Sequence, residues 1–338
     1  MRWLSAVGLS ALGLCATVSP VCAAEPVRII FDTDIGNDVD DVLALGLIHT
    51  LQSRGHCELL GVTCTINDPL AVPFVDAVNT FYGRPDVPIG SGREAVKTDP
   101  TKFLPLAEAK DDGKLRYPSD LTDAKAPEAK QLLRKLLAAE ADGSVVLVQV
   151  GFFSNLAGLL DTPGDSISPL SGRELIQQKV KFLSIMAGAF QNIAGDSRYR
   201  EYNVIKDVPA AQKLVKEWPT PIVFSGFEIG IAAPYSAQSI DRDYGYVAHH
   251  PLAESYQLYV PTPHERPTWD LTSVLYAVQP DRGYFGTSPV GRATVEADGF
   301  VYFTPDPKGQ HRYLTMDPQQ AARVREAFSQ LCSERPAR

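Results

Sequence analysis

The 338-residue sequence has few cysteines, no excess of basic residues, and no long apolar run after its first residues. Five Cys are too few for a disulfide-rich scaffold. Lys and Arg number 32 against 40 Asp and Glu, which gives a net charge of −8. Such a chain lacks the basic surface that binds nucleic-acid backbone. With 44% hydrophobic and 21% charged residues, it is typical of a globular protein with a large core.

Residues 1–24 have the pattern of a secretory signal peptide. Arg2 is the single charge, an apolar run follows it, and small residues occupy positions 21–24. The apolar run is shorter than the roughly 20 residues that a membrane span needs. We therefore expect an exported mature protein of residues 25–338, without a stable membrane anchor.

Apolar runs alternate with helix-like stretches along the mature chain. Five β-branched runs are typical of buried parallel strands, namely Val27–Asp32, Leu59–Thr65, Val145–Val150, Val180–Met186 and Pro221–Ser225. Apolar spacing and capping residues predict helices over Asp40–Leu51, Asp68–Tyr82, Pro127–Glu140, Asp207–Glu217 and Asp317–Leu331, and one that begins at Ser171. This alternation predicts a single α/β domain with an open, mostly parallel sheet flanked by helices.

Two segments interrupt the alternation. Residues 84–126 are polar and rich in Pro, Asp and Lys, and long irregular insertions of this kind often form lids or binding loops. Residues 291–314 predict a small β-hairpin near the C-terminus, with its turn at positions 297–299. In an open parallel sheet, ligands bind beyond the carboxyl ends of the strands. The residues that directly follow the five predicted strands are therefore the candidates for a site.

Five aspartates lie within ten residues after the first predicted strand, at Asp32, Asp34, Asp38, Asp40 and Asp41. Crowded carboxylates repel one another and raise their own pKa values unless a cation lies among them. Oxygen ligands suit a hard cation, Ca²⁺ or Mg²⁺. Helix capping explains one or two of these residues but not all five. An EF-hand is excluded, because Asn37 would occupy its required Gly and Leu43 its required Glu.

The pattern resembles the inosine–uridine-preferring nucleoside hydrolase family, whose signature is a strand followed by Asp-x-Asp-x-Gly-x-Asp-Asp. Here the strand and both acidic pairs match, with Gly36 between them, and two residues are inserted before the final pair. Further matches follow in order at Gly61–Asn67, Val150–Asn155, Met186–Asn203 and Trp269-Asp270. The resemblance covers essentially the whole mature chain.

The resemblance implies a metal centre. Ca²⁺ would be held by Asp34, Asp41, Asp270 and the backbone carbonyl of Val150. Asp34 would also be the general base that takes a proton from the attacking water. A carboxylate base suits Ca²⁺, which acidifies water less than Zn²⁺ does. Read without the family, Asp270 is typical of a helix N-cap.

The resemblance also implies a substrate site. Asp40 and Asn203 would hold the ribose hydroxyls, Glu201 the 5′ side, and Asn67 would support the metal or the sugar. Glu201 and Asn203 are two apart, so an extended segment would point both to one side. Trp269 occupies the position where members that act on purines and pyrimidines have His. This favours stacking on a purine base.

We therefore expect calcium-dependent hydrolysis of the N-glycosidic bond of ribonucleosides, with a preference for purines. The partner is a small nucleoside, and the resemblance makes a homo-oligomer possible. One alternative is an exported nucleoside-binding protein without turnover, although binding alone does not need Asp34 as a base. Another is a metal-dependent phosphatase of the haloacid dehalogenase type. That class requires Asp-Gly-Thr after its Asp-x-Asp, and Ile35-Gly36-Asn37 departs from it.

Overall fold

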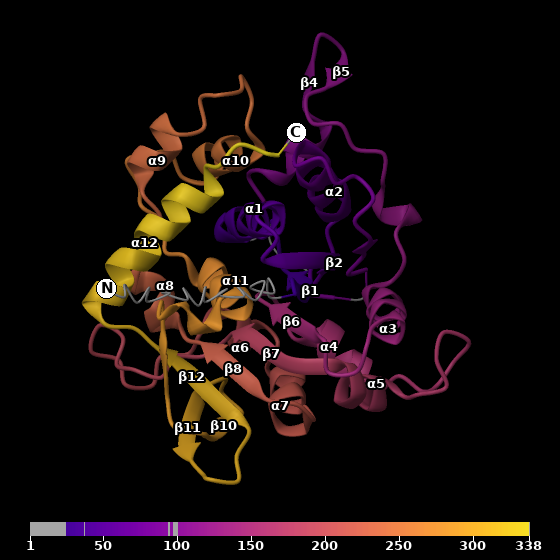
Figure 1. Ribbon diagram of the computed structural model, residues 1–338, viewed down its shortest axis with the longest axis vertical. Coiled ribbons are helices and arrows are strands. Elements are labelled where there is room, and N and C mark those ends of the chain that lie inside the picture. Colours follow the sequence, from indigo (N-terminus) through magenta and orange to yellow (C-terminus); the bar gives the residue numbers. More distant parts are fainter. Residues whose placement is uncertain (1–24, 37, 94, 97–100, 338) are drawn as a thin grey trace, which may run out of the picture.

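The computed structural model describes residues 25–36, 38–93, 95–96 and 101–337. The signal peptide predicted at 1–24 lies outside these residues. A ten-stranded sheet forms the centre of the molecule, and helices cover both of its faces (Figure 1). The predicted single α/β domain with a mostly parallel sheet is confirmed. Within the described part of the chain, no helix is both long and apolar enough to cross a membrane.

The five predicted strands all form, each within two residues of its predicted ends. They are β1 (Val27–Thr33), β2 (Cys57–Cys64), β6 (Val145–Gln149), β7 (Val180–Met186) and β8 (Ile222–Ser225). All five are parallel, in the order β8-β7-β6-β1-β2, and the short β3 (Ile89–Gly90) extends the β2 edge. Asp32, near the end of β1, is level with Thr63 on one side and Gln149 on the other. The carboxyl ends of these strands therefore meet at one edge of the sheet.

The predicted C-terminal hairpin is present as β10 (Gly291–Val295) and β11 (Val301–Pro305). The end of the predicted segment is a separate strand, β12 (His311–Thr315), which lies between β8 and β10. It is parallel to β8 and antiparallel to β10. The hairpin is therefore part of the main sheet, and β9 (Gly286–Thr287) pairs with β12.

The helices divide into two layers. One face of the sheet is covered by α1 (Asp40–Ser53), α2 (Ala71–Phe81), α10 (Pro251–Tyr259), α11 (Trp269–Val278) and α12 (Pro318–Cys332). The other is covered by α3 (Ala129–Ala139), α4 (Ser154–Leu160), α5 (Gly172–Lys179) and α7 (Val208–Glu217). Alternate residues of β1 serve the two cores, since Ile29 and Phe31 face the first layer and Ile30 the second. The middle of the strand therefore packs on both of its faces, as expected for a central parallel strand.

The remaining elements are short. They are α6 (Tyr202–Lys206), α8 (Phe227–Ala232), α9 (Ala237–Arg242), the 3₁₀ turns Leu104–Glu108, Asp123–Lys125 and Pro280–Arg282, and the two-stranded β4 (Lys110–Asp111) and β5 (Lys114–Leu115). The predicted capping box at Ser171 is confirmed, and Asp317 forms another. The start predicted at Asp68 is wrong, because its Oδ1 accepts a hydrogen bond from Leu70 N at 2.8 Å and closes a turn before α2.

Candidate active site

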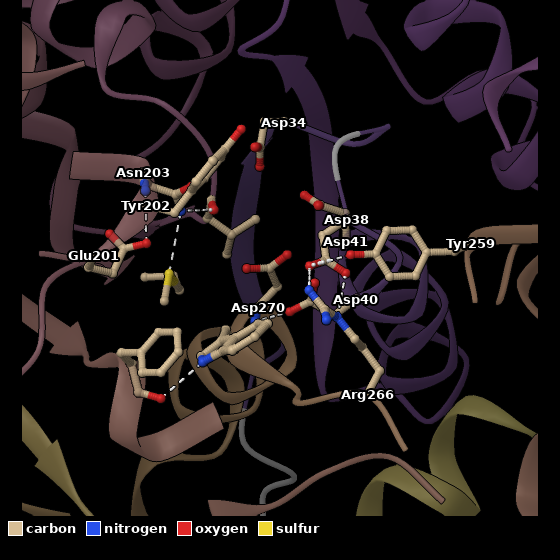
Figure 2. A pocket seen from close by; sticks show the side chains of 14 residues that line it. Asp34, Asp38, Asp40, Asp41, Glu201, Tyr202, Asn203, Tyr259, Arg266 and Asp270 are labelled. Atoms are coloured by element: carbon tan, nitrogen blue, oxygen red, sulfur yellow. Dashed lines mark hydrogen bonds and ion pairs between the residues drawn. The ribbon is translucent and has the colours of Figure 1, made fainter. Parts of the chain in front are cut away.

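A cavity of about 300 Å³ opens beyond the carboxyl ends of β1, β6 and β7. Acidic side chains form much of its wall: Asp34, Asp38, Asp40, Asp41, Glu201 and Asp270. The others are Tyr202, Phe227, Tyr259, Trp269, Arg266, Asn203, Met186 and Val150. In Figure 2, Glu201, Tyr202 and Asn203 lie across the cavity from the start of α1, with Asp270 between the two sides. All the predicted site residues except Asn67 line this cavity.

The acidic motif is shaped by a tight turn at Gly36. This glycine has φ +118°, a conformation that side chains rarely adopt, and a Cβ placed there would lie 2.7 Å from Leu104. The 84–126 insertion, which contains Leu104, therefore packs directly against the turn. Helix α1 begins shortly afterwards at Asp40, so Asp40 and Asp41 lie in its first turn. The positive end of the helix dipole favours their negative charge there.

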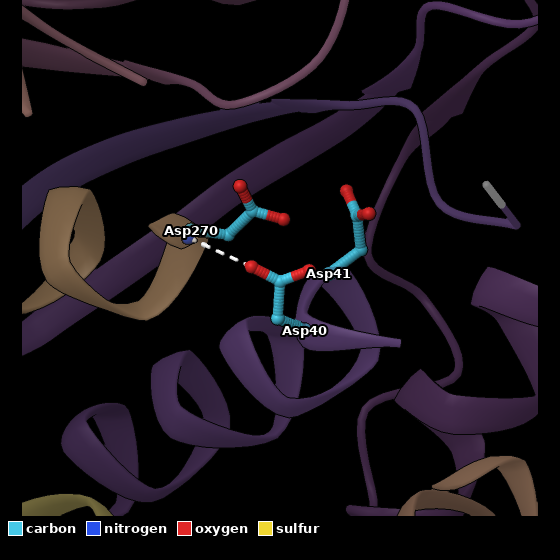
Figure 3. A group of neighbouring side chains, drawn as sticks. All are labelled: Asp40, Asp41 and Asp270. Atoms are coloured by element: carbon cyan, nitrogen blue, oxygen red, sulfur yellow. Dashed lines mark hydrogen bonds between the residues drawn. The ribbon is translucent and has the colours of Figure 1, made fainter. Parts of the chain in front are cut away.

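Three carboxylates converge in the wall of the cavity. Asp40, Asp41 and Asp270 are buried, and one oxygen from each lies within 4.8 Å of the others (Figure 3). Asp40 Oδ2 accepts a hydrogen bond from Asp270 N at 3.2 Å, and Asp41 accepts one from Thr33 Oγ1. Asp270 is the second residue of α11, and Thr268 occupies the N-cap position. The interpretation of Asp270 as a helix cap is therefore wrong, and its carboxylate points to the other two.

Asp34 lines the same cavity, outside the three-carboxylate group. Its Oδ2 is buried and has no hydrogen-bond partner. Burial, together with the negative charges of Asp38, Glu201 and Asp32, raises the pKa of Asp34 to about 8. Burial and mutual repulsion also raise the pKa values of the three converging aspartates well above their usual range. Buried carboxylates without a cation are costly, and this oxygen-rich set suits a hard divalent cation.

The segment that carries Glu201 and Asn203 is the start of helix α6, so the predicted extended conformation is wrong. Glu201 caps this helix, accepting hydrogen bonds from the backbone N–H groups of Asn203 at 2.8 Å and Val204 at 3.2 Å. Burial raises the pKa of Glu201 to about 7. Asn203 Nδ2 donates to the carbonyl of Val150 at 2.8 Å. Asn203, in the first turn of α6, therefore connects this helix to the carbonyl predicted to bind the metal.

The wall of the cavity contains a cationic side chain, Arg266, that sequence reasoning missed. Arg266 Nε donates to Asp38 Oδ1 at 2.9 Å, and its Nη2 donates to the other oxygen of Asp38. The guanidinium carbon lies 5.0 Å from the ring centre of Tyr259 and 4.9 Å from that of Trp269. Trp269 Nε1 donates to the carbonyl of Phe227 at 2.9 Å, and the two rings are 5.0 Å apart. Trp269 is therefore a half-buried ring that lines the cavity beside Phe227 and Arg266.

Residues 29–323 match the family described as inosine-uridine preferring nucleoside hydrolase. The chain belongs to this family. Membership places it among the hydrolases that act on N-glycosyl bonds, with a nucleoside as its small-molecule substrate. The convergent aspartates are thus a candidate metal centre in a family of metal-dependent enzymes.

Solved structures of other nucleoside hydrolases have the same fold. The inosine-uridine preferring enzyme from Bacillus anthracis matches with a TM-score of 0.66 and 17% identity, over 90% of this chain and 99% of that one. The purine-preferring ribonucleoside hydrolase from Gardnerella vaginalis matches with a TM-score of 0.63 and 19% identity, over 90% and 99%. An uncharacterized protein of Schizosaccharomyces pombe is 27% identical over 221 residues, 64% of this chain and 66% of that protein. The aligned segment is thus just under two thirds of the yeast protein's length.

In this nucleoside hydrolase the first aspartate of the motif lies behind the cavity and does not line it. Asp32 Oδ1 accepts hydrogen bonds from Thr63 Oγ1 at 2.5 Å and Asn155 Nδ2 at 2.8 Å, and its Oδ2 has no partner. Burial raises its pKa to about 7. The five clustered aspartates therefore occupy different environments.

Asn67 is the predicted site residue that the structure does not bring to the cavity. Asn67 lies between β2 and α2, and its Nδ2 donates to the carbonyl of Arg93, in the 84–126 insertion, at 2.7 Å. Asn67 is not among the residues that line the cavity.

Proposed function

We propose that the chain hydrolyses ribonucleosides in a Ca²⁺-dependent reaction, releasing ribose and a free base. The observation that carries this proposal is the unpartnered, buried Oδ2 of Asp34, beside three converging aspartates. These four buried carboxylates line one cavity, unlike Asp32, and so support a site built to receive ligands.

Asp34, Asp41, Asp270 and the carbonyl of Val150 would hold the Ca²⁺. The Val150 carbonyl already accepts from Asn203 and has a second lone pair available for a ligand. Bound Ca²⁺ would offset the repulsion among the carboxylates, bind the ribose diol and acidify a nearby water. Asp40 is held by Asp270 N through one oxygen, which leaves the other oxygen for a ribose hydroxyl.

Asp34 then removes a proton from the attacking water, whose oxygen forms a bond to C1′. The bond from C1′ to the base nitrogen breaks with its electron pair on the base, which gains a proton from solvent. Attack from the face opposite the base inverts the anomeric carbon. Asp40 and Asn203 hold the ribose hydroxyls, so that C1′ lies near Asp34. Glu201 fixes the end of α6 that carries Asn203.

A purine is the proposed base, because four aromatic side chains from different elements line the cavity: Tyr202, Phe227, Tyr259 and Trp269. Tyr202 is 38% exposed, with Lys206 Nζ 5.2 Å from the centre of its ring. Trp269 is less exposed, and its ring lies near Phe227 and Arg266. We therefore propose the more exposed ring, Tyr202, as the stacking partner.

The deciding experiment measures the release of reducing sugar from purine and pyrimidine ribonucleosides, with Ca²⁺ and with a chelator. We expect release with Ca²⁺, loss of release with the chelator, and recovery when Ca²⁺ is restored. Absence of release from every ribonucleoside would favour the alternative of a binding protein without turnover.

We also propose that the enzyme acts outside the cytoplasm after loss of residues 1–24. The support is the charge and apolar pattern of that segment. Mass spectrometry of the protein recovered from the exported fraction should give a chain that begins near Glu25. Recovery of the uncut chain from the cytoplasm alone would contradict the proposal.

A further inference from the structure

The Asp38–Arg266 ion pair arises from a local departure from the family signature. The signature has one residue between the glycine and the final acidic pair, and this chain has three, Asn37, Asp38 and Val39. Asp38 is therefore an addition to the motif, and its carboxylate receives both Arg266 and the hydroxyl of Tyr259, the latter at 3.3 Å. Figure 2 shows Arg266 reaching up to Asp38 beside Tyr259.

Arg266 is the one cationic side chain among the described residues that line the cavity. Its place is fixed from three directions, by Asp38 at one edge and by Tyr259 and Trp269 near its faces. A guanidinium has five N–H donors in a rigid plane. The pairing with Asp38 uses Nε and one hydrogen of Nη2, which leaves the edge formed by Nη1 and the second hydrogen of Nη2.

We propose that this edge of Arg266 binds the base of the nucleoside as it departs, and that it selects 6-oxopurines. The inference rests on the function proposed above and names the base. A 6-oxopurine offers N7 and O6 as two acceptors on one edge, which matches two parallel N–H donors. Adenine offers one acceptor and one donor there, so its amino group faces an N–H group without a hydrogen bond.

The charge of Arg266 also suits the reaction. As the C1′–N bond breaks, its electron pair moves onto the base, and negative charge spreads to N7 and O6. A fixed cation close to these atoms stabilises that charge in the transition state. Arg266 keeps its own proton throughout, because arginine is not deprotonated in proteins. The base takes its proton from solvent after it departs, so atoms and charge balance with the water that adds to C1′.

The test uses the Ca²⁺-loaded enzyme and three ribosides: inosine, adenosine and 4-nitrophenyl β-D-ribofuranoside. Nitrophenolate departs without help and has no N7–O6 edge. For Arg266→Gln we expect kcat/KM to fall on the order of 100-fold with inosine. With the nitrophenyl riboside it should change less than about threefold. Wild type should prefer inosine to adenosine by at least about tenfold, and the variant should lose most of that preference.

Arg198→Gln is the matched control. Arg198 is also paired with a carboxylate, Glu296 at 2.6 Å, and lies over an aromatic ring, Phe300 at 4.2 Å, but it does not line the cavity. Its replacement should leave all three rates unchanged. Asp38→Asn releases Arg266 from its partner and should lower the inosine rate while sparing the nitrophenyl riboside.

The outcomes separate the two proposals. If wild type hydrolyses neither inosine nor the nitrophenyl riboside, the proposed function fails. If wild type hydrolyses both and Arg266→Gln loses both equally, the residue only maintains the fold of the cavity and the inference is overturned. Unchanged inosine hydrolysis in Arg266→Gln, or equal use of adenosine and inosine by wild type, also overturns it.

Discussion

Helix α1 buries ionisable side chains at two places, and their surroundings differ. At its first turn, Asp40 and Asp41 face other carboxylates, and burial together with repulsion raises their pKa values. Further along the helix, His49 is fully buried with its Nε2 2.8 Å from Asn79 Oδ1 and its ring stacked on Tyr82 at 4.8 Å. Burial and the positive charge of Arg84 lower the pKa of His49 to about 3, so it is neutral at ordinary pH.

His49 and the aspartates differ in whether the chain itself supplies their partners. His49 is uncharged and has partners from the chain itself, which is the usual state of a buried polar side chain. The aspartates repel one another, and a cation from outside the chain would offset that repulsion. Burial alone thus does not distinguish a structural residue from a functional one. The surroundings do: His49 has partners within the fold, whereas the aspartates converge on one another at a cavity, and four experiments test this distinction.

The largest effect is expected at Asp34, whose Oδ2 has no partner. Asp34→Asn keeps the shape but removes the base, so kcat should fall on the order of 10³-fold. Binding of ribose, measured by calorimetry with Ca²⁺ present, should remain detectable. Asp142→Asn, at a carboxylate whose side chain is 64% exposed, serves as the control and should turn over normally. Normal turnover in Asp34→Asn would contradict the assignment of Asp34 as the general base.

The second effect concerns stability. If the aspartates bind Ca²⁺ in the folded state, Ca²⁺ at 100 times its Kd should raise the free energy of unfolding by about 2.7 kcal/mol. Thermal unfolding with Ca²⁺ and with a chelator measures this shift. Asp41→Asn should lose most of it and should be more stable than wild type in the chelator, because one repulsive charge is gone. Equal shifts in both proteins would show that Asp41 does not bind the ion.

The third effect concerns pH at the histidine end of the helix. His49 titrates near 6.5 when unfolded and near 3 when folded, so between these values the folded state binds fewer protons. The free energy of unfolding therefore falls as the pH falls below 6.5, by about 2 kcal/mol at pH 5. The stability advantage of wild type over His49→Gln should shrink by about this amount between pH 7 and pH 5, in denaturant titrations with Ca²⁺ present. A constant difference would contradict the buried neutral state.

The smallest effect is expected at Trp269, whose indole N–H and ring both have partners within the chain. Trp269→Phe loses one hydrogen bond, so kcat/KM with inosine should fall less than about tenfold. The kcat/KM of Tyr202→Ala should fall further, since a ring that stacks on a base contributes about 1–3 kcal/mol. A larger loss at Trp269 than at Tyr202 would restore the original stacking hypothesis.

The parallel strands and the acidic turn could be predicted because their signals are local. Ile29–Phe31 is an apolar run in the middle of β1, and the aspartates begin directly after it at Asp32. Parallel topology then brings the strand ends together, so Val150 and Met186 could be assigned to the same edge as Asp34. No distant contact had to be guessed.

The parts that were missed depend on distant contacts. Arg266 lies in an irregular segment before α11 and meets Asp38, 228 residues earlier in the chain. The spacing of residues along the chain does not predict such a pairing. The one signal in the sequence is Asp38 itself, the extra acidic residue of the motif, which requires a partner. The sequence does not distinguish the short helix α6 from an extended segment, because its cap, Glu201, is also a credible ligand. The sequence also does not show that β12 is separate from the hairpin, because a short strand does not reveal which neighbour it joins.

The position of β12 also determines which part of the chain closes the sheet and covers helix α1. It is the link between the hairpin of β10 and β11 and the parallel strands, and α12 follows it to pack on α1, where Cys332 Sγ donates to the carbonyl of Leu43 at 3.6 Å. A chain cut before His311 would leave β8 as an open edge and would remove α12 from α1, which would still pack against α10 and α11. The helix that presents Asp40 and Asp41 is therefore fully enclosed only when the last part of the chain has been made. The C-terminal segment thus makes a working pocket conditional on complete synthesis, and truncated chains would expose the surfaces that proteases recognise.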